Sequence, residues 1–196
     1  MALDIWRTAV VDPPWLERGG GKIKRGADRH YDLLTVAAIS EALHNSGLWR
    51  PYEHAHLYLW YTDNHLIDAL KLAEVLGFRY VRTFQWVKLR QDGKALRLGI
   101  GQYARGAHEG ALFCVRGKGK DSSVMTSRRD VPSCFLARHP MKDGKRVHSA
   151  KPEESFALVE ARSHGPYYEF FARSRRPGWG AWGLELEPKM DDKSCI

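Results

Sequence analysis

The sequence predicts an α/β fold in which a largely parallel sheet is covered by helices on both faces. Short apolar runs alternate along the chain with amphipathic segments of helical period, and this alternation is typical of βαβ units. The length of 196 residues suits one domain. We expect that domain over residues 1–186, followed by a polar tail over 187–196.

The composition excludes several classes of protein. Hydrophobic residues make up 43% and charged residues 28%, which argues against a mainly disordered chain. The apolar run from Leu57 to Tyr61 is too short to cross a bilayer, and Met1 to Asp4 does not begin a signal peptide, so we expect a cytoplasmic protein. The three cysteines are widely spaced and form no disulfide framework, and we expect Cys114 and Cys134 to be buried. The net charge of +8 favours an anionic partner such as nucleic acid.

The strands follow from apolar runs and from the residues that stop them. The first expected strand, Thr8 to Val11, ends at Asp12-Pro13-Pro14, because proline cannot donate to a sheet ladder. The other expected strands cover 55–61, 80–88, 111–115, 133–136 and 167–172.

The helices follow from caps and periodicity. We expect helices over 36–44, capped by Thr35, and over 64–76, capped by Asp63. A third, to about Arg162, opens at Lys151-Pro152-Glu153-Glu154, with proline at its first position and acids at the positive end of its dipole. The stretches 16–32, 89–101 and 117–130 are rich in Gly, Lys and Arg and are expected loops.

Ligands of such sheets lie beyond the carboxyl ends of the strands, where Asp12-Pro13-Pro14-Trp15 follows the first strand. The prolines fix a carboxylate and a carbonyl at the strand end, and Trp15 adds a flat apolar ring. Two acceptors beside an aromatic face suit the exocyclic amine of a stacked base. The other interpretation is a strand-terminating turn with a packed tryptophan.

Eight segments, in order along the chain, resemble those of a known family. They are Asp12-Pro13-Pro14-Trp15, His30-Tyr31, Leu59 to Leu66, Gly77-Phe78 with Phe84 to Lys88, Ala107-His108-Glu109, Val115-Arg116-Gly117, His148 to Glu153, and Glu169 to Gly183. Over roughly Asp4 to Leu186 the chain is thus similar to the DPPW-type (MT-A type) adenine-N6 methyltransferases, and especially to their compact bacterial and phage members.

The resemblance implies methyl transfer from S-adenosylmethionine to the N6 amine of adenine on a Rossmann-like sheet. It also implies a catalytic motif that precedes the main cofactor-binding strand. The catalytic residues are then Asp12, Pro13, Pro14 and Trp15: Asp12 and the Pro13 carbonyl hold the amine, and Trp15 flanks the base. Little beyond alignment of the nitrogen lone pair with the sulfonium methyl is needed.

The resemblance also implies residues that bind the cofactor. Lys151 would grip the methionine carboxylate, Asp12 the ammonium, and Glu169 and Arg173 the ribose, with Asp4 and Glu185 as further contacts. A solvated lysine in the first helical turn and an in-sheet ion pair between Glu169 and Arg173 are the structural alternatives. At Leu184 the sequence departs from the family, which usually has asparagine there.

On the substrate side, Tyr31 resembles the aromatic residue that closes over the base, and Tyr103 and Glu109 fall where the family lines the base pocket. Ordinary packing is the alternative for the last two. Two basic clusters, each after a strand, would track phosphates around an extruded base, unless they are merely solvated. They comprise Lys88, Arg90, Lys94 and Arg97, and then Arg116, Lys118, Lys120, Arg128 and Arg129.

His54 and His56 share one face of a strand, but two ligands without a third do not make a zinc site, so we expect a structural role and no metal. The favoured function is methylation of adenine in nucleic acid, with DNA preferred over RNA because the compact members that the chain resembles are prokaryotic or viral. A non-catalytic nucleic-acid-binding member of the same family is the alternative.

Overall fold

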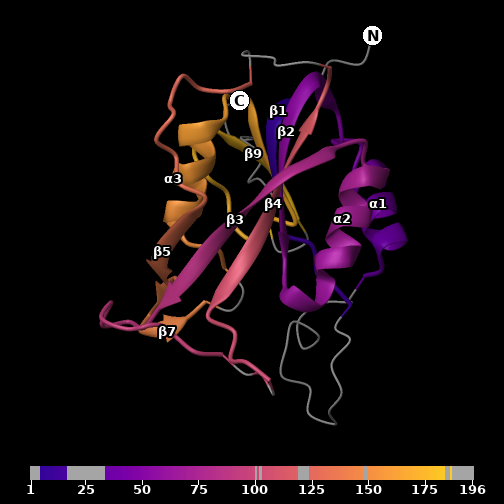
Figure 1. Ribbon diagram of the computed structural model, residues 1–196. Coiled ribbons are helices and arrows are strands. Elements are labelled where there is room, and N and C mark those ends of the chain that lie inside the picture. Colours follow the sequence, from indigo (N-terminus) through magenta and orange to yellow (C-terminus); the bar gives the residue numbers. More distant parts are fainter. Residues whose placement is uncertain are drawn as a thin grey trace, which may run out of the picture.

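The computed structural model describes residues 5–16, 34–99, 101, 103–118, 124–147, 150–183 and 186. These residues form a seven-stranded sheet of order β5-β3-β4-β2-β1-β8-β9 and a separate hairpin of β6 and β7 (Figure 1). The sheet strands are β1 (Trp6–Val11), β2 (Pro51–Tyr61), β3 (Arg79–Leu89), β4 (His108–Arg116), β5 (Cys134–Arg138), β8 (Tyr167–Phe170) and β9 (Trp179–Trp182).

The sheet is largely parallel, as predicted, and β4 is the strand that runs against its neighbours. β1 pairs in parallel with β2 and β8, β8 with β9, and β3 with β5, whereas β4 is antiparallel to both β2 and β3. In Figure 1 the arrowheads of β3 and β5 point to one end of the molecule and that of β4 to the other. The start of β4 therefore meets the carboxyl ends of the other strands.

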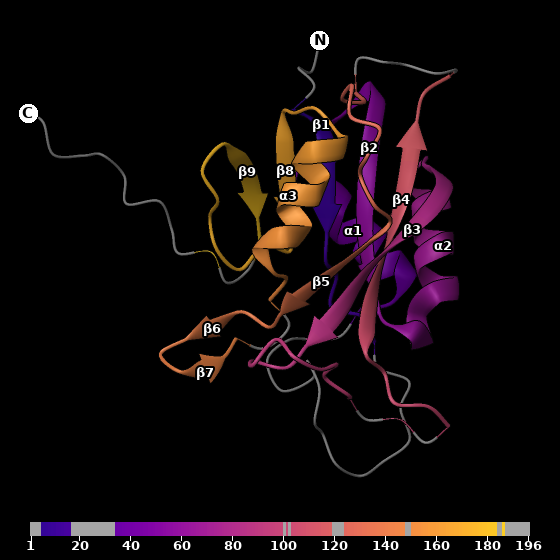
Figure 2. The same ribbon diagram turned by 60° about the vertical axis from the view of Figure 1, so that its left-hand side comes forward.

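Helices cover both faces of the sheet, which confirms the predicted layers (Figures 1 and 2). Helices α1 (Val36–Asn45) and α2 (Leu66–Val75) lie on one face, and α3 (Glu153–Arg162) lies on the other. Successive side chains of β1 enter opposite cores, because the side chains of a strand alternate. Val11 packs in the core that contains Ile39 of α1, and Val10 in the core that contains Val159 of α3.

Most predicted elements are present, with some corrected ends. Thr35 caps α1 as expected, since its hydroxyl accepts a hydrogen bond from the backbone N–H of Ala38 at 3.3 Å. Asp63 does not cap α2: it begins a 3-10 helix (Asp63–His65), after which α2 starts at Leu66. Pro152 is the N-cap of α3 rather than its first helical residue.

Two elements of the structure were not predicted. β9 extends the sheet beyond β8, and β6 (Met141–Lys142) and β7 (Lys145–Arg146) form a hairpin that projects from the sheet (Figure 2). Cys114 is buried as expected, but Cys134 is exposed, because it begins the edge strand β5. Among the described residues no helix is both long and apolar enough to span a bilayer.

Candidate active site

Asp12 follows the last residue of β1, in the middle of the sheet between β2 and β8. Its backbone N–H points to the Phe170 carbonyl at 3.4 Å, so the turn leaves the sheet directly after Asp12. The Pro13 carbonyl accepts the Trp15 N–H at 2.9 Å, and the Pro14 carbonyl accepts the Leu34 N–H at 2.9 Å. These bonds hold the Asp-Pro-Pro-Trp turn rigid, and each carbonyl oxygen keeps a second lone pair.

Lys151, at the start of the α3 segment, joins Asp12 to the beginning of β4. Its ammonium group donates to the Asp12 carboxylate at 2.6 Å and lies 3.4 Å from the Glu109 carboxylate. The ring of Trp60, at the end of β2, has its centroid 5.2 Å from Nζ. Only 8% of the Lys151 side chain is exposed, so it is not the solvated first-turn lysine that was one alternative.

Glu109 in turn binds a second lysine. Lys88, near the end of β3, donates to the other Glu109 oxygen at 2.6 Å, and its Nζ lies 5.3 Å from the centroid of the Trp86 ring. The four side chains form a chain of alternating charge, which we call the charge network: Asp12, Lys151, Glu109 and Lys88. They come from four separate elements, and the antiparallel direction of β4 brings Glu109 among them.

The charge network favours the ionised forms of Glu109 and Lys151 although both are shielded from water. Burial alone would raise the pKa of Glu109, but the charges of Lys151 and Lys88 lower it below its ordinary value. Burial likewise would lower the pKa of Lys151, but Asp12 and Glu109 raise it. The site therefore presents fixed charges of both signs at neutral pH.

Trp15 lies in the core rather than over an open site. Its side chain is 7% exposed, its indole N–H donates to the Trp60 carbonyl at 3.0 Å, and its ring stacks on His65 with centroids 5.5 Å apart. Most of the Trp15 ring is thus packed, as the second interpretation of this motif expected. The same bond ties the Asp-Pro-Pro-Trp turn to the end of β2, beside the Trp60 ring that faces Lys151.

Glu169 and Arg173 lie on the other side of Asp12. Glu169 pairs in register with Val10 in β8, and burial raises the pKa of its carboxyl to about 7, against the opposing charge of Arg176. The charges of Asp12 and Lys151 also act on this carboxyl, and that of Arg173 acts on Lys151. These groups therefore belong to one electrostatic environment.

Comparison with known proteins identifies the family. The MT-A70 family model matches residues 6–185, nearly the whole chain. The chain belongs to the MT-A70 family. It is 28% identical over 192 residues to the N6-methyladenosine RNA methyltransferase MTA1 of Pyricularia oryzae, covering 90% of this chain and 46% of that protein. It is 25% identical over 188 residues to the human N(6)-adenine-specific methyltransferase METTL4, covering 90% of this chain and 36% of that protein. The chain thus spans less than half the length of these two relatives.

Not every residue implied by the MT-A70 resemblance joins the charge network. Tyr103 is fully exposed, so the packing interpretation does not describe it, and its contact with the base stays a prediction. Arg90 is exposed and lies 3.4 Å from Asp92. Asp4, Tyr31, Lys120, Leu184 and Glu185 lie outside the described residues.

The second basic cluster lies at the wrong end of the sheet for the predicted role. Because β4 is antiparallel, its last residue, Arg116, is level with Ala55 in the first half of β2. The chain then passes the end of α3, where the Thr126 N–H donates to the Arg162 carbonyl at 3.1 Å, before it reaches Arg128 and Arg129. The expectation that this cluster follows a strand at the catalytic edge is therefore wrong. Arg128 instead binds Asp130 at the surface.

The MT-A70 site contains an arginine that the sequence analysis left without a role. Arg176 makes a bidentate ion pair with Glu153 in the first turn of α3, and its guanidinium carbon lies 3.6 Å from the centroid of the Phe156 ring. Its charge also acts on Glu169. Arg176 falls inside a segment that resembles the family, and that was the signal available.

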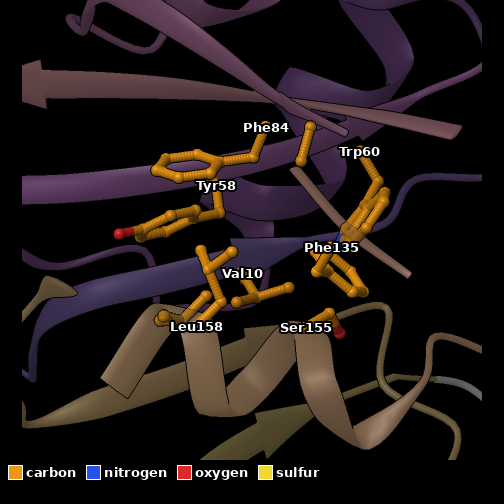
Figure 3. Close-up of a pocket in the computed structure, with 9 residues that line it drawn as sticks. Val10, Tyr58, Trp60, Phe84, Phe135, Ser155 and Leu158 are labelled. Atoms are coloured by element: carbon orange, nitrogen blue, oxygen red, sulfur yellow. The ribbon is translucent and has the colours of Figure 1, made fainter. Parts of the chain in front are cut away.

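The cavity in Figure 3 adjoins this site at Trp60, which lines both. It lies between the sheet and α3, and its volume is about 10 Å³, about the room for one water molecule. Its lining is mostly apolar, with Val10, Tyr58, Phe84, Phe135 and Leu158 among the side chains. We interpret it as a packing gap within the core.

His56 has the structural role that was expected. Its Nδ1 lies 2.7 Å from the Ser163 hydroxyl, which also contacts the Tyr58 hydroxyl at 2.8 Å. Within the described ranges no group of three or more metal-ligating side chains comes together.

Proposed function

We propose that this MT-A70 protein transfers a methyl group from S-adenosylmethionine to the N6 amine of adenine in nucleic acid. The observation that carries the proposal is the ion pair between Asp12 and Lys151 at the carboxyl end of β1, where a parallel sheet binds its ligands. Both named relatives are N6-adenine methyltransferases by name, which supports the same reaction. The intact pair favours an active enzyme over a non-catalytic member.

The charges of the site fit the amino-acid end of S-adenosylmethionine. A zwitterion offers an ammonium group to Asp12 and a carboxylate to Lys151, so each buried charge keeps a partner of opposite sign. Glu169 is shielded from solvent, and its carboxyl would bind the ribose hydroxyls. Arg173 belongs to the same electrostatic environment and would bind the ribose with it. Asp4 and Glu185 are further contacts in this proposal. The motif that orients the amine then precedes β8, the strand that carries Glu169.

When bound, the cofactor supplies an electrophilic sulfonium methyl group. The task of the chain is to orient the amine so that its lone pair faces that methyl carbon. The Asp12 carboxylate and the Pro13 carbonyl can each accept one amine hydrogen, and Pro14 and Trp15 hold these acceptors in place. Methylation would leave the amine with one proton to lose, and Asp12 would be the adjacent acceptor for it.

Adenine in DNA is the substrate that we favour, on the resemblance to compact bacterial and phage members. The relatives do not decide between the polymers, since one name specifies RNA and the other only adenine. Glu109 and Lys88, at the opposite end of the charge network from Glu169, would face the base, and Tyr31 would close over it.

The decisive experiment supplies S-adenosylmethionine with an isotopically labelled methyl group, together with DNA and RNA of the same adenine-containing sequence. After digestion to nucleosides, mass spectrometry should find labelled N6-methyladenine, formed faster in DNA than in RNA. Labelled N6-methyladenine in neither polymer would refute the reaction. Formation in RNA alone would refute the preference for DNA.

A further inference from the structure

The β6–β7 hairpin carries exposed positive charges. Asp143 and Gly144 connect its strands, with φ angles of 51° and 73°, as a two-residue turn with both central residues left-handed requires. The pairing places Lys142 directly opposite Lys145, and all of its side chains are exposed. Like charges opposite each other destabilise a ribbon that is already marginal on its own. An anionic partner would relieve this repulsion.

The hairpin lies at the catalytic edge of the sheet. It follows β5, whose end pairs with the end of β3, and Figure 2 shows it projecting beyond that end. The Val147 N–H donates to the Pro140 carbonyl at 3.0 Å and closes its base. Five peptide units then lead from Arg146 to Lys151, so their Cα atoms are at most about 18 Å apart.

The base of the hairpin adjoins a buried histidine among cations. His139 is 8% exposed, lies edge-on to Trp86 with centroids 4.8 Å apart, and has no hydrogen-bond partner for Nδ1 among the described residues. Burial, and then the charges of Lys88, Arg146 and Arg97, lower its pKa to about 4. Arg97, from the loop after β3, and Arg146, from β7, therefore both act on His139 together with Lys88 of the charge network.

We propose that the β6–β7 hairpin is a nucleic-acid-binding arm, in which Lys142, Lys145 and Arg146 contact backbone phosphates of the strand that carries the target adenine. It rests on the proposed function, because it takes nucleic acid as the substrate. A stacked strand rises 3.4 Å per nucleotide, so the 18 Å limit between Arg146 and Lys151 corresponds to about five nucleotides of strand. Contacts to phosphate position the strand and carry no sequence readout.

The test replaces Lys142, Lys145 and Arg146 together with glutamine. A matched control replaces with glutamine three exposed cations at the opposite end of the strands, Arg79, Arg82 and Lys118, and so removes the same charge. Fluorescence anisotropy with a short DNA containing one central adenine, over a range of salt concentrations, gives Kd and its salt dependence. In the hairpin variant we expect Kd to rise about tenfold or more and the salt slope to fall by about 2 to 3. The control should change Kd by less than about twofold.

Two further measurements separate the arm from other effects. A variant that keeps the charges, with Lys142→Arg, Lys145→Arg and Arg146→Lys, should bind DNA as the unchanged protein does. Calorimetry with S-adenosylmethionine should give the same Kd for the unchanged protein and the glutamine variant. Unchanged DNA affinity in the glutamine variant, or an equal loss in the control at the opposite end of the strands, would overturn the arm. Selective weakening without any adenine methylation would support the arm and refute the proposed reaction.

Discussion

Lys151 is the residue on which the site depends most, because two carboxylates share its charge. Asp12 lies on one side of it and Glu109 on the other, and the Trp60 ring faces it. Removal of any one partner leaves the others charged and poorly hydrated, which costs more than the lost contact alone. Single substitutions in the charge network should therefore separate binding, chemistry and stability.

Asp12→Asn tests the orientation of the amine. The amide keeps the volume, but it loses the charge and can present an N–H where the adenine amine needs an acceptor. We expect kcat for methyl transfer to fall by at least about a hundredfold, while the chain stays folded because Lys151 keeps Glu109. Methylation rates measure the first effect and thermal unfolding measures the second. The exposed variant Asp130→Asn is the control for both measurements. A parental rate in Asp12→Asn would remove Asp12 from catalysis.

Lys151→Ala tests the grip on the cofactor. Loss of one charge-assisted contact should raise the Kd for S-adenosylmethionine about tenfold or more. The free energy of unfolding should fall by about 1 to 3 kcal/mol, because Asp12 and Glu109 lose their shared cation. Calorimetry and urea unfolding give the two quantities, with Lys71→Ala on the exposed face of α2 as control. An unaltered Kd would show that Lys151 is only structural.

Glu169→Gln tests the protonation of the buried acid. The ordinary pKa of glutamate is 4.5, and burial raises that of Glu169 to about 7. Between these pH values the folded chain holds a proton that the unfolded chain has lost, so this group lowers stability as pH rises, up to about 3 kcal/mol above pH 7. Glutamine does not titrate. Relative to the parent, the variant should gain stability from pH 4.5 to 7 in urea unfolding, and parallel pH profiles would contradict the assignment.

At the scale of elements, the start of β4 is packed against the end of β2. A Cβ atom on Gly110 would lie 2.5 Å from the ring of Tyr61, which is itself buried in the core. Gly110→Ala should therefore lower the free energy of unfolding by about 1 to 3 kcal/mol. Gly106→Ala is the matched control, because its Cβ would meet nothing within 4 Å. Urea unfolding of both variants compares them, and equal stabilities would mean that Tyr61 moves freely.

The order of helices and strands could be predicted from the sequence, because caps, prolines and apolar periods act locally. The direction of β4 could not, since its apolar run, Ala111 to Val115, has the same pattern in either direction. β9 was missed because Trp179–Trp182 holds glycine and lacks a typical strand run. The hairpin at Asp143-Gly144 was missed because its strands are only two residues long and hold no apolar run.

The candidate site was predictable where residues follow parallel strands. Asp12 was placed correctly at the end of β1, and the structure brings it to Lys151, as two separate motifs suggested. Lys88 and Glu109 join Asp12 and Lys151 through tertiary contacts, which no local sequence pattern encodes. The burial of Trp15 likewise depends on its stacking on His65, fifty residues further along the chain.

At the scale of the whole molecule, the antiparallel strand divides the basic residues between two ends of the sheet. Lys88, Arg97 and the hairpin lie at the catalytic end, and Arg116, Arg128 and Arg129 lie at the other. Among the described residues, these cations are therefore not gathered at one end of the sheet. Nonspecific attraction acts over the whole molecule, but short-range phosphate contacts do not.

Arg128→Ala combined with Arg129→Ala tests this division. Arg128 already binds Asp130, and both arginines lie away from the charge network. We expect the Kd for an adenine-containing DNA to change by less than about twofold and the salt slope to stay the same. Anisotropy titrations at several salt concentrations measure both. A large loss of affinity for every DNA sequence would show that this end of the molecule does bind the substrate.

The antiparallel direction of β4 also affects how easily the connection between β3 and β4, at the rim of the site, can change in length. The chain leaves β3 at Leu89 and enters β4 at His108, at the same end of these two antiparallel strands. The Lys88 N–H donates to the Ala107 carbonyl at 2.8 Å across the base of this connection. A segment anchored in this way can gain residues without rerouting the fold, because doubling a flexible loop costs only about 0.6 kcal/mol in closure entropy. Insertions there would reshape the rim of the site while Glu109 keeps its place at the start of β4.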